Sequence, residues 1–493
     1  MNRNTLFASL VAAGLLAACA SSPLAPAKSG VDLAAQPLPA NDGWAAAEGA
    51  VTGGIGAKSE HIFTVSSRKE LVDALAKAGK APKIILVKGT VNLSADDSGK
   101  ELTEKDYAVA PYDFKEYMKA YQPSVWNVKP LVKGRPERKL SGPQEEARVA
   151  SSARQKAQIV INVPSNTSII GLGADAKIVK GNLVIGDGSE NVIIRNITFE
   201  DAFDYFPGWD PGDSFKIDKD YPGCQEVFEN QFAGPQRCPG GRWNSEYDNI
   251  SINGGKRVWI DRCTFTDGER TDDKFPPVFK FPHNEPTQKV QHHDGAVDVT
   301  NGADLVTISY SVFKDHDKTN LIGGSDSNKL DPGKLRVTFH NNLFENVGQR
   351  MPRVRFGKVH TYNNLFIGDA TLADDPNGTA FQNHNRPAMG QKLKGNIFRQ
   401  ALGAGKDSAI YSEANVFEIK NGGTQHAVVN MGGKAFFDAG SLVNGKPLDI
   451  KEAGGKPLSP DVGWKPTLYG NNKVKPAADV PAYVKATAGA GKL

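Results

Sequence analysis

Residues 290–324 read VQHHDGAVDVTNGADLVTISYSVFKDHDKTNLIGG and carry the pattern on which the fold prediction depends. Within them, VTISYSVF (306–313) alternates apolar positions and ends on a phenylalanine, as a half-buried strand does. Asp294 and Asp298 precede this octet and Lys318 follows it. If the octet belongs to a stack of strands, these polar side chains lie on one wall of the stack.

The octet recurs along the second half of the chain. Copies are VIIRNITF (192–199), VWIDRCTF (258–265), VTFHNNLF (337–344) and VHTYNNLF (359–366), with shorter echoes KGNIF and EANVF ending at Phe398 and Phe417. Strands that repeat at short intervals, with longer intervals carrying insertions, indicate a solenoid. We therefore expect an all-β protein, a right-handed parallel β-helix with long loop insertions and a few short helices. Unrelated strands of a β-sandwich would explain the alternation but not the register.

Asparagines support the stacked register. Asn342, Asn364, Asn396 and Asn415 each stand two positions before the phenylalanine of their copy. Asparagines stacked at a bend can hydrogen-bond to one another and to neighbouring turns. We expect these four to form one ladder.

The register also places three carboxylates together. Superposing the octets at 258 and 306 puts Asp248 level with Ala296, one coil or about 4.8 Å away. Alternate strand residues share a face, so Asp294, Ala296 and Asp298 are expected to point the same way. A hard cation relieves the repulsion of such a cluster, and oxygen ligands favour Ca²⁺. Gly295 bends the chain so that both later aspartates reach one ion, or else they serve different ions; isolated surface aspartates are the alternative.

Positive charge is expected on the next coils. Lys318 and Arg350 stand at similar distances after Phe313 and Phe344, so each is predicted to open the strand after its bend. In QRMPRVRFG (349–357), alternation places Arg353 and Arg355 on one face. Cations beside a calcium cluster suit a substrate that carries carboxylates. Salt bridges between coils would be the structural alternative.

The N-terminus has the features of an export signal. Arg3 precedes a short apolar run, and the run ends in Leu-Ala-Ala-Cys19, the pattern of a bacterial lipoprotein cleavage box. We expect residues 1–18 to be a signal peptide and 19–45 a flexible tether. The protein is then exported and anchored through acylated Cys19 to the bacterial outer membrane or cell surface, or secreted if the signal is an ordinary one.

The remaining cysteines fit an exported protein. Cys224 and Cys238 bracket a loop rich in Pro and Gly and could form a disulfide in an oxidising compartment. Cys263 lies inside a strand pattern and is expected to be a buried thiol.

Composition limits the other possibilities. The 493 residues are 39% hydrophobic, enough for a large core, and 51 glycines and 30 prolines favour short elements with many turns. The net charge is only +4 and there is no basic tract, so no nucleic acid partner is expected. We expect a monomer with one domain over residues 46–493, carrying insertions at 94–157 and 202–247.

Several segments resemble a known family. WNSEYDNISI, VWIDRCTFTDG, QHHDGAVDVTNGADLVTISYSVF, HDKTNLIGGSDS and QRMPRVRFGKVHTYNNLF are similar, in this order, to signature segments of the pectate lyases of polysaccharide lyase family one. The resemblance covers nearly all of the mature chain. One departure is Arg262, where the family usually has histidine after WID.

The resemblance implies a right-handed β-helix that cleaves de-esterified homogalacturonan (polygalacturonate) by calcium-dependent β-elimination. It implies Asp248, Asp294 and Asp298 as calcium ligands and Arg350 as the Brønsted base. It implies Lys318 and Arg355 as binders of substrate carboxylates. Because arginine is protonated in nearly all proteins, an arginine base predicts an alkaline optimum.

Three alternatives stay open at this point. A β-helix polygalacturonase would hydrolyse the same polymer with paired acids and leave no ultraviolet-absorbing double bond. A pectin lyase would prefer the methyl-esterified polymer. An anchored binding protein would hold the polysaccharide without turnover.

Overall fold

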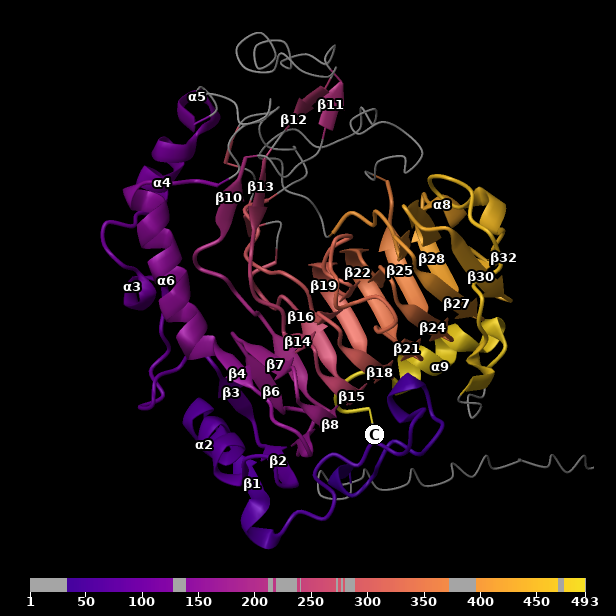
Figure 1. Cartoon of the computed structure of the whole chain (residues 1–493), viewed down its shortest axis with the longest axis horizontal. Helices are drawn as coiled ribbons and strands as arrows, with labels where there is room; N and C mark the ends of the chain where they lie inside the picture. Colours follow the sequence, from indigo (N-terminus) through magenta and orange to yellow (C-terminus); the bar gives the residue numbers. More distant parts are fainter. Residues whose placement is uncertain are drawn as a thin grey trace, which may run out of the picture.

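Figure 1 shows the computed structural model of the chain. The structure describes residues 33–126, 139–211, 216–218, 237–239, 241–271, 274–275, 278–279, 289–371, 396–468 and 474–492. Three sheets wind around one elongated apolar core, and their strands are parallel except for the last pair of sheet three, β31 and β32. The colours in Figure 1 run in order along the stack. The predicted right-handed parallel β-helix is confirmed.

The strands of sheet one are, in spatial order, β1 (Ile62–Val65), β2 (Lys83–Val87), β5 (Thr167–Gly171), β8 (Glu190–Arg195), β15 (Lys256–Asp261), β18 (Asp304–Ser309), β21 (Val337–His340), β24 (Lys358–Tyr362), β27 (Ala409–Glu413) and β30 (Ala435–Ala439). Those of sheet two are β4 (Val160–Asn162), β7 (Asn182–Gly186), β14 (Ile250–Asn253), β17 (Val297–Thr300), β20 (Leu321–Ile322), β23 (Arg353–Val354), β26 (Leu402–Gly405) and β29 (Val428–Met431). Those of sheet three are β3 (Thr90–Asn92), β6 (Lys177–Val179), β9 (Thr198–Glu200), β16 (Thr264–Thr266), β19 (Val312–Lys318), β22 (Leu343–Gln349), β25 (Leu365–Asp369), β28 (Val416–Lys420), β31 (Leu442–Val443) and β32 (Lys446–Pro447).

Each coil runs from sheet one to sheet three, then to sheet two, and then into the next coil, as in β15, β16, β17 and β18. The described helices are α2 (Arg68–Ala78), α3 (Glu104–Tyr107), α4 (Phe114–Tyr121), α5 (Pro123–Trp126), α6 (Pro143–Ile159), α8 (Thr424–Ala427) and α9 (Val480–Thr487), with 3-10 turns η1 (Trp44–Ala46), η2 (Ser59–His61), η4 (Ile450–Glu452), η5 (Pro466–Leu468) and η6 (Ala477–Asp479). No helix in this part of the chain combines the length and the apolar composition needed to cross a membrane.

A stack of phenylalanines records the register of the coils. Its members, in order, are Phe199, Phe265, Phe313, Phe344, Phe366 and Phe417, which pair directly across sheet three. Neighbouring rings are 4.5–5.2 Å apart between centroids and within 4–11° of parallel. Phe398 is not a member, since Phe366 pairs with Phe417, so the prediction that KGNIF marks a coil of its own is wrong.

An asparagine ladder lies at the bend between sheets one and three. The Asn342 side chain donates to Asn364 Oδ1 at 2.9 Å, and the Asn364 side chain donates to Asn415 Oδ1 at 2.9 Å. Ser441 continues the row by accepting from the Asn415 N–H. The predicted ladder is therefore confirmed for three asparagines, whereas Asn396 bonds to Asn346 instead.

The N-terminal part of the described chain packs against the solenoid. Leu33 and Leu38 are buried in a cluster on sheet one, and Trp44 is buried beside them. The prediction of a flexible tether through residue 45 is therefore wrong from residue 33 onward, because these apolar side chains cover the outer face of sheet one. Residues 1–18 and Cys19 lie outside the described residues.

One helix covers the N-terminal end of the solenoid and another covers part of its side. Leu71 and Leu75 of α2 enter the main core at the N-terminal end, and Ser67 caps this helix by accepting from the Glu70 N–H. Near the C-terminus, Val480 and Val484 of α9 pack on the outer face of sheet three. The apolar face of α2 thus shields the N-terminal end of the core.

The first insertion carries the helices α3 to α6, and the second carries two antiparallel hairpins. These hairpins pair β10 (Gly208–Asp210) with β13 (Arg242–Asn244) and β11 (Lys216–Asp218) with β12 (Arg237–Pro239). Tyr117 of α4 packs with Trp209 of β10 and Trp243 of β13 in a second apolar cluster. Figure 1 shows α4 and α6 along one side of the molecule, with β10 and β13 beside them.

Removing the middle rung of the ladder should destabilise the protein. Asn364→Ala removes the acceptor of the Asn342 backbone and side-chain N–H groups and the donor to the Phe339 carbonyl inside the core. We expect the free energy of unfolding to fall by about 3 kcal/mol, because each buried polar group left unsatisfied is costly. Denaturant unfolding checks this, with exposed Asn162→Ala as the matched control; equal stability of the two variants would contradict the role of the ladder.

Candidate active site

The predicted site residues gather where sheet three turns into sheet two. Asp298 lies in β17, and Asp248 and Asp294 lie just before β14 and β17. Lys318 ends β19 and Arg350 follows β22. Four consecutive coils therefore contribute to one edge of the solenoid.

The position of Asp248 differs from the prediction by one residue. Ser251 pairs with Asp298, which sets Asp248 opposite Gly295 and not Ala296. The Gly295 N–H donates to Asp248 Oδ1 at 2.8 Å. The predicted register was wrong because the turn between β17 and β18 is one residue longer than the turn between β14 and β15, so the octet offset does not extend into sheet two.

Gly295 brings the carboxylates close by lacking a side chain. A Cβ at this position would lie 2.4 Å from Asp298 Oδ1 and 2.8 Å from Asp248 Oδ1. The chain bends at Ala296, whose side chain is buried in the core, so the prediction that it shares a face with Asp294 and Asp298 is wrong. The bend occurs because the chain turns here from one sheet into the next.

The three carboxylates have different electrostatic environments. Burial and the Asp294 charge raise the pKa of Asp248 to about 6. Burial, Asp248 and Asp294 raise the pKa of Asp298 well above its usual range. Burial also opposes ionisation of Asp294, but Lys318 and Arg350 outweigh it and lower its pKa. The neighbouring cations therefore do not balance the negative charge of all three carboxylates, and a bound cation would stabilise the cluster.

Protein groups already occupy some of the carboxylate oxygens. Ser251 donates to Asp248 Oδ2 at 2.6 Å, the Leu321 N–H donates to Asp298 Oδ1 at 2.9 Å, and Lys318 Nζ lies 2.6 Å from Asp294 Oδ1. In the described ranges, no three His, Cys, Asp or Glu side chains converge in the arrangement of a bound metal. The donor chemistry fits a hard, oxygen-binding cation such as Ca²⁺. Asp294, with a side chain 29% exposed, is the carboxylate accessible to it.

Lys318 is held between two coils. Its Nζ donates to Gln291 Oε1 at 3.0 Å and pairs with Asp294. Burial lowers the pKa of Lys318, and the Asp294 charge partly restores it. The prediction that Lys318 opens a strand is wrong, because sheet three continues through the expected bend and Lys318 pairs with Gln349 at the end of β19.

Arg350 has an unusual backbone conformation. Its φ is 61°, and its carbonyl accepts from the Asn320 N–H at 2.7 Å and from Thr319 Oγ1 at 2.9 Å. The preceding coil thus holds a non-glycine residue in the left-handed region, which costs on the order of 1 kcal/mol. Its Nε is buried and has no hydrogen-bond partner among the described residues. Arg350 also follows a strand and does not open one, contrary to the prediction.

Arg355 follows β23 on the same coil as Arg350 and is partly committed to the protein. Its Nε pairs with Asp326 Oδ1 at 2.6 Å, and an Nη donates to the Gly323 carbonyl at 2.8 Å. Asp326 is 64% exposed, and exposed ion pairs contribute little. Arg355 therefore forms a salt bridge, as the alternative predicted. Because this pair is weak, the Arg355 guanidinium can exchange Asp326 for a ligand.

A buried ion cluster under the site was not found from the sequence. Asp317, which precedes Lys318, pairs with Lys289 at 2.6 Å and with Arg399 at 2.6 Å. Burial disfavours the Asp317 charge, but the two cations outweigh it and hold its pKa well below the usual range. Lys289 and Arg399 lie far from Asp317 in the sequence, so the pairing could not be predicted. Only the alternation within β19 could have indicated that Asp317 and Lys318 face different partners.

The remaining predicted residues lie elsewhere or outside the described part. Cys263 is a buried free thiol, as expected, and burial raises its pKa to about 12. Arg262 pairs with Asp261 and stacks on Tyr310, away from the carboxylates. The predicted Cys224–Cys238 disulfide lies outside the residues whose side chains are described.

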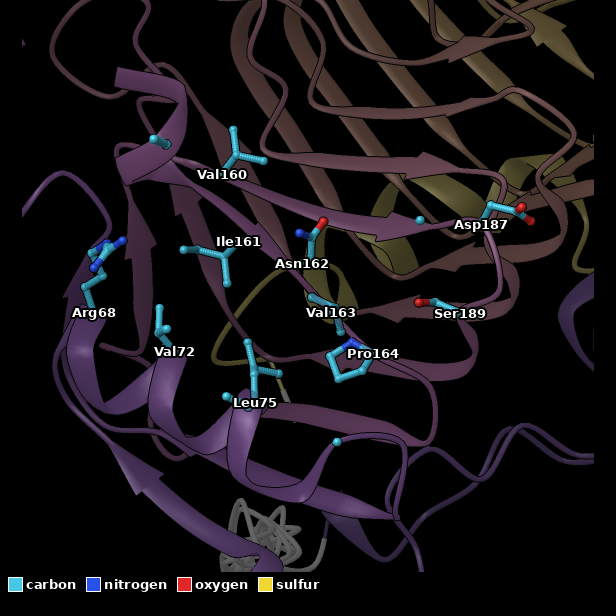
Figure 2. A pocket seen from close by; sticks show the side chains of 14 residues that line it. Arg68, Val72, Leu75, Val160, Ile161, Asn162, Val163, Pro164, Asp187 and Ser189 are labelled. Carbon is cyan, nitrogen blue, oxygen red and sulfur yellow. The ribbon is translucent and has the colours of Figure 1, made fainter. Parts of the chain in front are cut away.

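A cavity of about 580 Å³ lies far from these residues, between α2 and the edge strand β4. Figure 2 shows Val72 and Leu75 of α2 across from Ile161 and Val163. Its lining includes none of the predicted site residues. Cavity size alone therefore does not locate the candidate active site.

Comparison with known proteins gives a consistent result. The pectate lyase family model matches residues 4–111, 139–222 and 227–493. A pectate lyase of Bacillus subtilis (strain 168) is 42% identical over 464 residues, which cover 94% of this chain and 94% of that protein. The solved pectate lyase from Acidovorax avenae subsp citrulli is 32% identical with a TM-score of 0.79, covering 96% of this chain and 98% of that one. A pectate lyase bound to a hexasaccharide is 41% identical with a TM-score of 0.76, covering 94% and 100%.

The ion cluster under the site should make stability depend on pH. Asp317→Asn should lower the free energy of unfolding at pH 7 by about 3 kcal/mol, since it leaves two partly buried cations without this carboxylate. Because the folded-state pKa of Asp317 is depressed, its contribution is fully present above about pH 4, the unfolded value, and is lost as pH falls through the folded value. Denaturant unfolding of both proteins at pH 7, 5 and 3 checks this. A gap as large at pH 3 as at pH 7 would contradict the assignment.

Proposed function

The chain belongs to the pectate lyase family of polysaccharide lyases, and we propose that it cleaves polygalacturonate by calcium-dependent β-elimination. The observation that supports this most is the edge at which buried carboxylates of two coils face the cations of the next two. Asp248 and Asp298 have raised pKa values, and Lys318 and Arg350 stand beside Asp294. Such an edge suits a cation that binds to the protein carboxylates and a substrate whose own carboxylates bind to the protein cations.

In this proposal Asp248, Asp294 and Asp298 hold the calcium ion. When bound, the ion supplies Lewis-acid neutralisation of a substrate carboxylate. The accessible carboxylate of Asp294 would exchange its Lys318 partner for the ion. Lys318 would then be released to bind the galacturonate.

The protein's own cations carry the remaining chemistry. Lys318 and Arg355 bind the carboxylate of the reacting sugar and stabilise the negative charge that grows when the adjacent C5 proton leaves. Arg350 takes that proton, and its left-handed backbone aims the side chain from the coil edge. The C4–oxygen bond then breaks, the electron pair leaves with the glycosidic oxygen, and a 4,5 double bond remains without any water being consumed.

We also propose that the protein is exported. The apolar run before Cys19 supports a signal peptide, and the Leu-Ala-Ala-Cys pattern supports acylation of Cys19. An acylated Cys19 would keep the enzyme at a bacterial membrane surface, where it acts as a monomer on an extracellular polymer.

The reaction leaves a conjugated double bond whose ultraviolet absorbance can be followed directly. We expect polygalacturonate to gain absorbance with enzyme and calcium, and to gain none with a chelator. Arg350→Ala should lower the rate about a thousandfold, since a positioned base contributes up to that order. Exposed Lys358→Ala on sheet one is the control and should keep the rate.

Activity that persists in chelator would contradict the metal role, and full activity of Arg350→Ala would contradict the base. Reducing ends that appear without absorbance would instead indicate hydrolysis by a polygalacturonase. Faster cleavage of methyl-esterified polymer would indicate a pectin lyase. Calcium-dependent binding without any product would indicate a binding protein.

A methyl group at Gly295 should disturb the calcium ligands specifically. Gly295→Ala places a Cβ within 2.8 Å of carboxylate oxygens of Asp248 and Asp298, so at least one must move. We expect the calcium concentration for half-maximal activity to rise about tenfold, an order typical of disturbed metal sites. Gly324→Ala is the matched control, because its Cβ would meet only Thr300 at 3.7 Å. An unchanged calcium requirement in Gly295→Ala would rule out these carboxylates as ligands.

A further inference from the structure

Four arginines gather beside the candidate active site: Arg242, Arg350, Arg353 and Arg355. Arg355 pairs with Asp326. In the part of the chain that the structure describes, the other three make no ion pair with a carboxylate, and each has a buried Nε without a hydrogen-bond partner. The mechanism above uses Arg350 and Arg355, and it gives no role to Arg242 or Arg353.

The electrostatics of Arg353 indicate that this group of cations lacks an anion. Burial, together with the charges of Arg355, Arg350 and Arg242, lowers the pKa of Arg353 to about 10. Like charges brought together away from water repel one another. A bound anion would remove both the repulsion and the unsatisfied donors.

Strand register places Arg353 on the outer face of sheet two. Its neighbour Val354 is buried in the core, and alternation turns the Arg353 side chain outward. Arg353 pairs with Leu321 of the preceding coil, and the Leu321 N–H donates to Asp298 Oδ1. Arg353 is therefore two coils from Asp298, about 10 Å along the stack.

The surface around Arg353 is kept flat by glycines. Arg353 pairs with Gly403, where a Cβ would lie 3.3 Å from Arg353 Cγ. A Cβ at Gly405 would lie 3.2 Å from Arg355 Cγ. The coil after β23 thus has no side chain at these two positions, which leaves room for the Arg353 and Arg355 side chains beside it.

Arg242 approaches from a different part of the chain. It lies in β13, in the hairpin of the second insertion, and pairs with Asp210 through the backbone ladder of β10. It is near enough to Arg353 for its charge to act on that group. The insertion and the solenoid therefore present two cations to the same space.

The position of these cations along the stack indicates which carboxylate they take. A carboxylate bound to an ion at Asp298 stays within a few Å of it, because calcium–oxygen distances are about 2.3–2.6 Å. Arg353 stands about 10 Å from Asp298 by coil spacing, and Arg355 on the same coil already serves that carboxylate in the mechanism, so Arg353 is left to take another one. Polygalacturonate carries one carboxylate on every sugar, so the neighbouring sugar supplies the second.

We propose that Arg353 and Arg242 bind the carboxylate of a galacturonate next to the reacting sugar, and so act as specificity-determining residues for the de-esterified polymer. The inference rests on the proposed function. Esterification of that neighbouring sugar would remove the charge that the two guanidinium groups pair with. The site would then select a run of free carboxylates rather than a single one.

Kinetics on substrates of increasing length test this role. Arg353→Gln and Arg242→Gln should each raise the KM for polygalacturonate about tenfold and leave kcat within about twofold, because a contact to a non-reacting sugar contributes equally to ground and transition states. Because every cleaved substrate contains the sugar across the breaking bond, the neighbour proposed here is the sugar on the other side of the reacting one. The increase in KM should vanish for the shortest oligogalacturonate that is cleaved, which lacks this sugar. Arg353→Lys keeps the charge and should show a smaller increase.

Lys358→Gln removes the same charge from exposed sheet one and is the matched control, with no expected change. Unfolding midpoints of all variants show whether they remain folded. An unchanged KM on every substrate, an equal increase at all lengths, or a loss confined to kcat would each overturn the inference.

Binding without turnover separates this inference from the proposed function. In an Arg350→Ala background with calcium, calorimetry with a hexagalacturonate should give a Kd about tenfold higher when Arg353 is also changed to Gln. An equal Kd would overturn the inference. Absence of unsaturated product from the wild-type protein would instead contradict the proposed function, so the two claims fail on different measurements.

Discussion

The hydrogen-bond register between successive coils positions every side chain of the candidate site. Parallel strands stack at a fixed spacing, so a residue on one coil has a defined neighbour on the next. The Phe313 and Phe344 rings stack 4.8 Å apart and record this spacing in the core. Where sheet three turns into sheet two, the same spacing brings Asp248 beside Gly295 and places Arg350 one coil beyond Lys318. No single segment of the chain contains the site, which is assembled only by stacking.

Much of this could be predicted from the sequence because the solenoid repeats itself. A strand buried on one face alternates, and an interior phenylalanine recurs at each coil, so the octets gave both the fold and an approximate register. The same reasoning brought Asp294 and Asp298 together with Asp248. Cys263 was correctly predicted to be buried, since it occupies an inward position of an octet.

The errors come from turns and insertions, where length is not fixed by the repeat. One extra residue between β17 and β18 shifted Asp248 by one position, because each bend can absorb a residue without disturbing the sheets on either side. Asn396 matched the ladder motif but lies in an excursion between β25 and β26 and bonds to Asn346. Arg242 belongs to an insertion with no repeat at all, so its approach to Arg353 followed only from the three-dimensional structure.

The central claim is that stacking makes a cation site from Asp248, Asp294 and Asp298. The most direct measurement is anomalous diffraction from crystals of the protein grown with calcium. We expect a calcium peak with oxygen atoms of all three carboxylates at about 2.3–2.6 Å, and Lys318 Nζ moved away from Asp294. A calcium peak elsewhere, or no peak here with the Lys318–Asp294 pair intact at saturating calcium, would contradict the account.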